Sequence, residues 1–177
     1  MMKRLGKLLA AGTLVACGAV ATHGVYAAAS SSAPADADNA FIDAMTGDWS
    51  MDGPTLGKPT HYALHGERIL AGGFVRFQMR DKAKPPQYQA DFFLGYDKNK
   101  HDYIGHWLDQ FGAAGARVVA EGHRNGNTLV LIFPYAEAAF RDTFTFDPDK
   151  HAWTWLLESQ EKDGKWSTFA KYDVTKG

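Results

Sequence analysis

Cysteine is almost absent from this chain: Cys17 is the only one among 177 residues. Because Cys17 lies in the N-terminal segment, the domain that follows has no thiol for a disulfide or for thiol chemistry. The chain also lacks an excess of either charge, since 19 basic and 20 acidic residues give a formal net charge of −1. Recognition through bulk charge is therefore not expected, and we predict no nucleic-acid partner and no binding to anionic membrane surfaces.

Sequence motifs of several enzyme classes are missing as well. There is no G-x-S-x-G motif, no P-loop, no dinucleotide-binding glycine fingerprint and no H-E-x-x-H motif. His61 and His65 share a strand face but would lie about 13 Å apart, at roughly 3.3 Å per residue, too far to bind one ion. A metal site built from separate strands, or a haem site near His151, would need inward histidines. We therefore expect no cofactor and no metal.

Long apolar runs are also missing, apart from one near the N-terminus. A basic start, an apolar run over residues 8–21 and small residues around 25–29 form the three parts of a secretory signal. The run is too short and too interrupted for a permanent membrane span. Residues 1–29 are therefore predicted to be an export signal, and the protein to be periplasmic or anchored in the envelope of a bacterium.

Cys17 leaves two interpretations open. Leu14-Val15-Ala16-Cys17 resembles the bacterial lipobox, in which the cysteine becomes the lipidated first residue. Alternatively, Cys17 is a small apolar residue within an ordinary signal, and cleavage occurs at the later alanines. Under the first interpretation, the lipid anchor at Cys17 would be the only contact with the membrane. Residues 30–39 lack apolar periodicity and are predicted to form a flexible leader.

From Trp49 onward, strand-forming stretches recur about every ten residues, each bounded by turn residues. Asn125-Gly126 and Asp163-Gly164 suit type I′ hairpins, and Asp147-Pro148-Asp149-Lys150 suits a type I turn. The expected strands cover residues 48–53, 60–70, 74–81, 87–96, 102–111, 116–125, 128–134, 139–146, 152–161 and 165–174. We predict an all-β fold, a single antiparallel up-and-down β-barrel of about ten strands over residues 40–177, with a short helix at 40–45.

Alternation along these strands predicts which side chains face the barrel interior. Pairing Tyr96 with His101 groups Tyr88, Ala90, Phe92, Leu94, Tyr103, Gly105, Trp107 and Asp109. Pairing Phe146 with His151 groups Phe140, Asp142, Phe144, Trp153, Trp155 and Leu157. Pairing Lys162 with Lys165 adds Trp166, Thr168, Ala170, Tyr172 and Val174. These inward sets are mostly aromatic, which predicts that the sheet closes around them.

Three charged residues, Arg68, Asp109 and Asp142, stand among the inward aromatics. A buried charge must be paired or solvated. One interpretation is a ligand pocket in which Arg68 holds an anionic or carbonyl group, an aspartate accepts a hydrogen bond and aromatic side chains form flat walls. The candidate ligand-binding residues are Arg68, Trp107, Asp109, Asp142, Trp155 and Tyr172. The alternative is an internal salt bridge, or Arg68 stacked on Trp49, in a barrel filled with side chains.

Several motifs resemble known families. Gly47-Asp48-Trp49 after a short helix resembles the G-x-W motif of lipocalin-like barrels. Leu70-Ala71-Gly72-Gly73-Phe74, Gly95-Tyr96-Asp97 and Trp107-Leu108-Asp109 are similar, in order and spacing, to the bacterial domain-of-unknown-function 1579 family across residues 41–176. The resemblance implies a lipocalin-like (calycin) barrel and no established activity. The chain departs from the pattern at Gly53, a glycine expected closer to Trp49.

Three functions fit these observations. We favour an exported envelope protein that binds a small, partly apolar ligand inside the barrel and is not an enzyme. A second hypothesis is a structural or interaction module with a filled barrel. The third is a hydrolase or lyase that uses Asp109 or Asp142 as a general base, with Arg68 stabilising developing negative charge.

Overall fold

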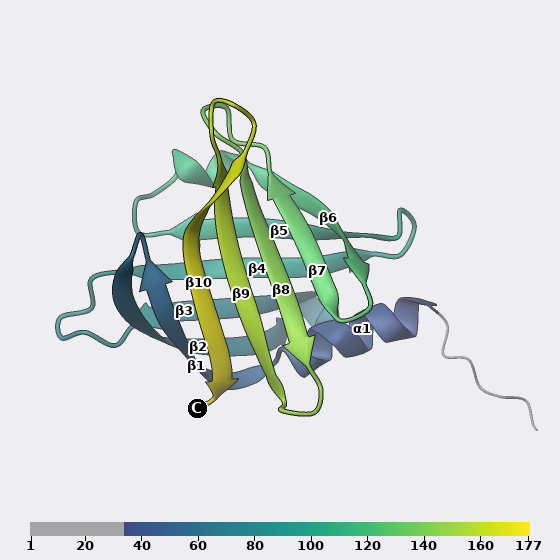
Figure 1. Ribbon diagram of the computed structural model, residues 1–177. Helices are drawn as coiled ribbons and strands as arrows, with labels where there is room; N and C mark the ends of the chain where they lie inside the picture. The colour runs from purple at the N-terminus through teal and green to yellow at the C-terminus, as the bar shows by residue number, and fades with distance from the viewer. Residues whose placement is uncertain (1–33) are drawn as a thin grey trace, which may run out of the picture. The chain divides into compact units, whose positions relative to one another are not determined.

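In the part of the chain that the structure describes, residues 34–177, ten β-strands close into one antiparallel barrel (Figure 1). The structure is a computed structural model, and it describes side chains from residue 37 onward. The strands follow chain order around the barrel, and the first strand pairs with the last. The predicted up-and-down barrel is confirmed. The expected export signal and Cys17 lie outside the described residues.

A helix, α1 (Pro34–Ala44), precedes the barrel. The strands are β1 (Gly47–Thr55), β2 (Lys58–Ile69), β3 (Phe74–Asp81), β4 (Gln89–Asp97), β5 (Asp102–Asp109), β6 (Val119–Asn125), β7 (Thr128–Phe133), β8 (Phe140–Asp147), β9 (Ala152–Gln160) and β10 (Trp166–Lys176). Short 3-10 turns, η1 (Leu70–Gly72) and η2 (Gly115–Arg117), lie in the β2–β3 and β5–β6 connections. Among the described helices, none has the length and apolar character to cross a membrane.

Two hairpins pair in a register that is shifted by two residues from the predicted one. Tyr96 pairs with Tyr103 rather than with His101, and Phe146 likewise pairs with Trp153. The backbone of His101 is left-handed, with φ of 58°, so this residue stays in the turn. Because a shift of two residues leaves every side chain on its original face, the predicted inward sets of β4, β5, β8 and β9 survive this correction.

A β-bulge in β10 overturns part of the predicted inward face. The pairing of β10 with β9 shifts between Thr168 and Ala170. Ala170 is buried as expected, whereas Thr168, also expected inside, is exposed. Trp166 lies on the outer face, where the guanidinium carbon of Arg141 is 4.5 Å from its ring centroid. The bulge turns Phe169 toward the interior instead.

Helix α1 begins at Pro34, earlier than the predicted start at Ala40. Proline suits the first turn of a helix because its missing N–H group would have no partner there. Part of the predicted leader is therefore helical. The apolar side of the helix is buried, and it consists of Phe41, Ile42 and Met45.

The end of α1 fits closely against the start of the barrel. The Trp49 indole N–H donates to the backbone oxygen of Met45 over 3.0 Å. Gly66 of β2 makes room for this contact, since a Cβ atom there would lie 2.8 Å from the same oxygen. The helix therefore covers one end of the barrel.

Two arginines hold α1 in place. Arg68 Nε donates to Asp43 Oδ1 over 2.7 Å, and its Nη2 donates to the backbone oxygen of Asn39 over 3.1 Å. Arg124 Nε donates to Asp38 Oδ1 over 2.7 Å. Burial raises the pKa of Asp38, but hydrogen bonds from Tyr103 and Arg124 outweigh burial and hold this pKa below its usual value.

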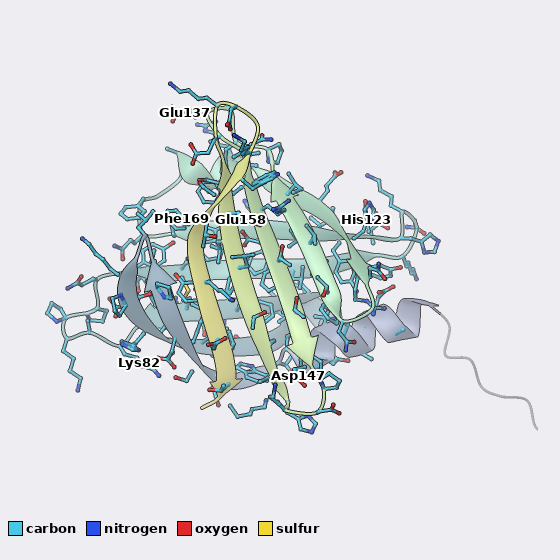
Figure 2. All side chains as sticks on the ribbon, viewed as in Figure 1. Lys82, His123, Glu137, Asp147, Glu158 and Phe169 are labelled. Carbon is cyan, nitrogen blue, oxygen red and sulfur yellow. The ribbon has the colours of Figure 1, made fainter. Side chains whose placement is uncertain are left out.

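Most charged side chains lie on the outer surface of the barrel. Figure 2 shows Lys82, His123 and Asp147 pointing away from it. Glu67 and Arg76 form an ion pair on the outer face. Such half-exposed pairs contribute little to stability, so the fold depends chiefly on the apolar interior.

Candidate functional site

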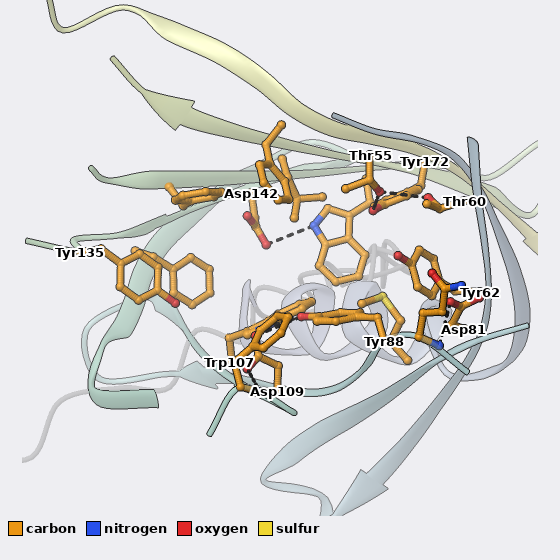
Figure 3. A pocket seen from close by; sticks show the side chains of 18 residues that line it. Thr55, Thr60, Tyr62, Asp81, Tyr88, Trp107, Asp109, Tyr135, Asp142 and Tyr172 are labelled. Atoms are coloured by element: carbon orange, nitrogen blue, oxygen red, sulfur yellow. Dashed lines mark hydrogen bonds between the residues drawn. The ribbon is translucent and has the colours of Figure 1, made fainter. Parts of the chain in front are cut away.

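The barrel end opposite α1 contains a cavity of about 490 Å³ (Figure 3). It lies where β1, β3, β5 and β7 end and the following strands begin. At roughly 30 Å³ per molecule, this volume equals that of about sixteen waters. It also falls within the range of small-molecule pockets, about 300–1,000 Å³.

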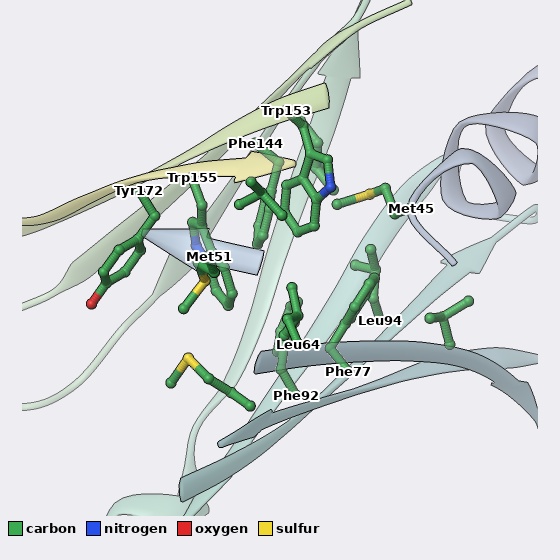
Figure 4. Close-up of a cluster of buried hydrophobic side chains, with 14 of the residues drawn as sticks. Met45, Met51, Leu64, Phe77, Phe92, Leu94, Phe144, Trp153, Trp155 and Tyr172 are labelled. Atoms are coloured by element: carbon green, nitrogen blue, oxygen red, sulfur yellow. The ribbon is translucent and has the colours of Figure 1, made fainter. Parts of the chain in front are cut away.

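Below the cavity, the interior is filled with side chains (Figure 4). Phe92 and Phe144 stack with ring centroids 5.8 Å apart, and Phe144 lies 4.7 Å from Trp155. Phe77 and Trp153 extend this cluster toward α1. The sequence left open whether the barrel interior is filled with side chains or contains a pocket. The half near α1 is filled, and the opposite half contains the cavity.

Aromatic rings form most of the cavity wall. Trp107 of β5 and Trp155 of β9 meet edge to face with ring centroids 5.6 Å apart. Ten of the eighteen lining residues are aromatic: Tyr62, Tyr88, Trp107, Phe111, Phe133, Tyr135, Phe140, Trp155, Phe169 and Tyr172. They come from the strand segments near this end of the barrel and from the connections beside them. The wall can therefore bind flat or bulky apolar groups.

The charged groups in the wall are all acidic. Among the described residues, the lining includes Asp81, Asp109 and Asp142, with no lysine, arginine or histidine. The remaining polar groups are hydroxyls of tyrosine and threonine and the Gln87 amide. The cavity is therefore a region of negative potential within a ring of aromatic faces.

Asp142 is the most deeply buried of these carboxyls. Only 2% of its surface is exposed, and its carboxyl group projects into the cavity (Figure 3). The Trp155 indole N–H donates to Asp142 Oδ2 over 3.2 Å. Burial raises the pKa of Asp142 to about 7, and the Trp155 hydrogen bond offsets only part of that effect.

Asp109 ends a short chain of hydrogen bonds in the opposite wall. The Trp107 indole N–H donates to the Tyr88 hydroxyl over 3.2 Å, and that hydroxyl donates to Asp109 Oδ2 over 3.1 Å. The backbone N–H of Phe111 donates to Asp109 Oδ1 over 2.9 Å. Burial raises the pKa of Tyr88, with Asp109 adding to this effect, so the phenol stays protonated.

A second hydroxyl chain lies near the β1–β2 connection. Thr60 donates to the backbone oxygen of Gly53 over 2.9 Å, so its oxygen is free to accept from Thr55, 2.9 Å away. Thr55 in turn accepts from the Tyr172 hydroxyl at 2.5 Å. Burial raises the pKa of Tyr172 to about 12. The chain orients Tyr172 as a fixed part of the wall.

Five of the six candidate ligand-binding residues come together in this cavity: Trp107, Asp109, Asp142, Trp155 and Tyr172. Arg68 does not join them. It lies at the α1 end, where its guanidinium pairs with Asp43 and also donates to the backbone oxygen of Gly72 over 3.0 Å. Arg68 therefore forms no salt bridge with Asp109 or Asp142, and its partners are Asp43 and Gly72 rather than the Trp49 ring. Because Arg68 does not line the cavity, it cannot hold an anionic or carbonyl group of a ligand bound there.

Some lining residues were missed by the sequence reasoning. Tyr135 continues the alternation of Leu131 and Phe133 beyond the end of β7, so the same inward series indicates it. Phe169 had no such signal, because only the bulge in β10 turns it inward. Phe111 lies in a connection, where strand alternation no longer applies.

The histidines of the described chain lie elsewhere. His151 is exposed in the β8–β9 turn, and His123 is exposed on the outer face of β6. His61 and His65 pair with Asp52 and Asp48, each over 2.6 Å, on the outer surface. Among the described residues, no three histidine, cysteine, aspartate or glutamate side chains gather closely enough to hold a metal ion.

Comparison with curated proteins found no match. A family described as "Protein of unknown function (DUF1579)" matches residues 35–176, from the first turn of α1 to the end of β10. The motifs around Gly72, Tyr96 and Trp107 had indicated this family. The chain therefore belongs to the DUF1579 family.

Proposed function

We propose that this protein binds a small, partly apolar molecule inside the open half of its barrel. The observation that carries the proposal is the cavity of about 490 Å³, walled by aromatic rings and containing the buried carboxyl of Asp142. Pockets that bind small molecules combine these features, a mostly apolar wall and a few polar groups that fix orientation.

The same observation argues against a module with a fully packed interior. A protein that needed its barrel only for stability would gain by filling this space, because each lining ring loses packing contacts across a void. Asp142 would also be replaced readily by an apolar residue, since a buried carboxyl without a cation is costly. An open cavity with a buried carboxyl in its wall is instead what a binding site requires.

Native mass spectrometry of the protein purified from its own host tests this proposal. The expected result is added mass on the folded protein that disappears on denaturation. The matched variant is Leu157→Trp, which places a larger side chain in the cavity and should carry no added mass. Identical masses for the folded and denatured wild type, together with no effect of any small apolar probe on Trp107 and Trp155 emission, would contradict the proposal.

A second function, acid–base catalysis, is favoured by one observation. Burial raises the pKa of Asp142 to about 7, a value suited to proton transfer near neutral pH. Arg68 is too distant from this cavity to act as the anion stabiliser in such a reaction. Any turnover of a cavity ligand should show a pH–rate limb near 7 that Asp142→Asn removes. Turnover that survives this substitution would exclude the role for Asp142.

We further propose that residues 1–29 direct export, with Cys17 as the attachment site if the protein is lipidated. The basis is the signal-like pattern of this segment and the Leu14-Val15-Ala16-Cys17 motif. Mass spectrometry of the mature N-terminus distinguishes the forms. A lipid-modified Cys17 supports the anchored form, a start at Ala28 or Ser30 supports the free form, and an intact Met1 in the mature protein contradicts export through cleavage.

A further inference from the structure

We infer that the cavity ligand is an organic cation, an amine or quaternary ammonium compound, whose positive charge lies against Asp142 and whose apolar part lies against the aromatic wall. This inference rests on the proposed binding function and specifies the chemical class of the ligand. It differs from the sequence-based expectation of an anionic or carbonyl group held by arginine.

The charge of the cavity is the first argument. Its lining includes three carboxyl groups and, among the described residues, no basic side chain. An anionic ligand would meet repulsion there without a compensating partner. A neutral apolar ligand would make no use of the ionised form of Asp142, whereas a cation would pair with it.

Hydrogen bonding singles out Asp142 among the three carboxyl groups. Asp81 accepts backbone N–H groups on both oxygens, from Ala83 over 2.8 Å and from Gln87 over 3.1 Å. Both oxygens of Asp109 are likewise occupied. Asp142 accepts a hydrogen bond only on Oδ2, and no donor among the described residues reaches its Oδ1. Asp142 lines the open cavity, so a bound molecule can reach this free oxygen.

The wall around Asp142 suits a cation as well. Aromatic faces carry negative electrostatic potential, and they attract a cation that lies within about 6 Å of a ring centroid. Trp155 lies directly beside Asp142 and meets Trp107 edge to face. An ammonium group at Asp142 would therefore have indole rings as well as the carboxylate as neighbours.

The polar side chains that face Asp142 come from β9 and from the β7–β8 connection. Trp155 of β9 donates its N–H to the carboxyl. Tyr135, in the β7–β8 connection, is close enough for Asp142 and Asp109 to raise its pKa in addition to burial. None of these groups is a cation. A bound cation should therefore favour the ionised form of Asp142, so its affinity should increase as the pH rises from 5 to 8.

Three probes with the same phenylethyl group separate charge from shape. They are phenylethyltrimethylammonium, its uncharged carbon analogue (3,3-dimethylbutyl)benzene, and the anion 3-phenylpropionate. The quaternary ammonium has no titratable proton, so any pH dependence of its binding reports on the protein. Isothermal titration calorimetry gives Kd for each probe against wild type, Asp142→Asn and Asp173→Asn. Asp173 is exposed on β10, so its substitution removes one negative charge outside the cavity.

The expected result is that the cation binds wild type at least tenfold more tightly than the uncharged analogue, with the anion weakest. Asp142→Asn should weaken cation binding at least tenfold and change binding of the uncharged analogue less than twofold. Asp173→Asn should leave both affinities unchanged within twofold. Asn is close to Asp in size and carries no buried charge, so the variant should fold, and binding of the uncharged analogue verifies that its cavity is intact.

The contradicting results are distinct for the two proposals. Equal binding of the cation and the uncharged analogue, or a cation preference that survives Asp142→Asn, overturns the assignment of a cationic ligand and leaves the binding function standing. Binding of none of the three probes, together with no added mass on the host-purified protein, overturns both.

Discussion

Asp142 is the residue on which the chemistry of the cavity depends. Its carboxyl is 2% exposed, accepts one hydrogen bond and has no cationic partner among the described residues. Strand alternation predicted its inward position, and with it the inward positions of Trp107, Trp155 and Asp109. The absence of Arg68 from this group was not predictable by alternation, because parity assigns a face but not a depth along the barrel.

Replacing Asp142 should change the pH dependence of stability. Its pKa is about 7 in the folded protein and about 3.9 when unfolded, so the folded state binds the proton more tightly between these values. Stability at this site is therefore greatest below about pH 4 and is lost as the pH rises through about 7. The wild type should lose about 2–4 kcal/mol over this range that Asp142→Asn does not lose. Urea unfolding at pH 4, 6 and 8 measures the difference.

The control for this prediction is Asp173→Asn, which should retain the wild-type slope. Parallel stability curves for wild type and Asp142→Asn would contradict the burial of an uncompensated carboxyl at residue 142.

Tyr88 links Trp107 to Asp109, and its hydroxyl should contribute measurably to stability. Tyr88→Phe removes one acceptor and one donor from a half-buried chain, so it should lower the free energy of unfolding by about 1–2 kcal/mol. Tyr135→Phe is the matched control, because the Tyr135 hydroxyl makes no hydrogen bond with a described residue, and its effect should stay within about 0.5 kcal/mol. Equal losses in chemical denaturation would show that the linkage is not formed.

At the scale of elements, α1 is a structural cover for the filled end of the barrel. Its position depends on Arg124, which pairs with Asp38 and also donates to Tyr103 over 3.1 Å. The side chains of Arg124 and Asp38 are only 20% and 12% exposed. Such a pair has little screening, so loss of the arginine would leave a nearly buried carboxylate without a counter-charge.

Arg124→Met should therefore lower stability at neutral pH by about 1–3 kcal/mol. Because the folded pKa of Asp38 lies below its usual value, the stability from this pair is present above about pH 4 and is lost as the pH falls through the folded pKa. The difference between wild type and variant should shrink in acid. Arg76→Met, which breaks the outer pair with Glu67, should cost less than about 1 kcal/mol. Hydrogen exchange of α1 amides reports whether the helix loosens, and unchanged exchange would contradict its anchoring by Arg124.

Turn residues and alternation predicted most elements but not their exceptions. The Asp147-Pro148-Asp149-Lys150 turn and the glycines at 126 and 164 mark real hairpin connections. The bulge at Thr168 and Ala170 left no comparable mark, and it changes the face of every β10 residue on its N-terminal side. The early start of α1 was missed because its first turns lack apolar residues. The arginines that hold α1, Arg68 and Arg124, come from strands far along the chain.

At the scale of the whole molecule, the barrel divides its interior between stability and binding. The half under α1 contains packed rings, and the opposite half leaves about 490 Å³ open. Strand alternation predicts that the aromatic side chains of both halves point inward. It does not indicate at which depth the packed core ends and the cavity begins. That boundary depends on side-chain contacts across the barrel, such as those of Trp155 with Phe144 and Trp107.

Filling the open half should separate binding from folding. Leu157→Trp should abolish probe binding, by at least tenfold in Kd, while the free energy of unfolding changes by less than about 1 kcal/mol because the new ring enters space that is already open. Leu156→Trp on the outer face of the same strand is the control and should leave Kd unchanged. Probe binding that survives Leu157→Trp would place the binding site outside this cavity.

The most direct measurement is a carbon-13 NMR titration of the Asp142 carboxyl, without and with saturating phenylethyltrimethylammonium. The resonance is assigned by its loss in Asp142→Asn. A pKa of about 7 in the free protein, falling clearly when the cation is bound, is the predicted result. A pKa near the ordinary value of an aspartate, or one that the cation leaves unchanged, would contradict a buried carboxyl that serves as the ligand's counter-charge.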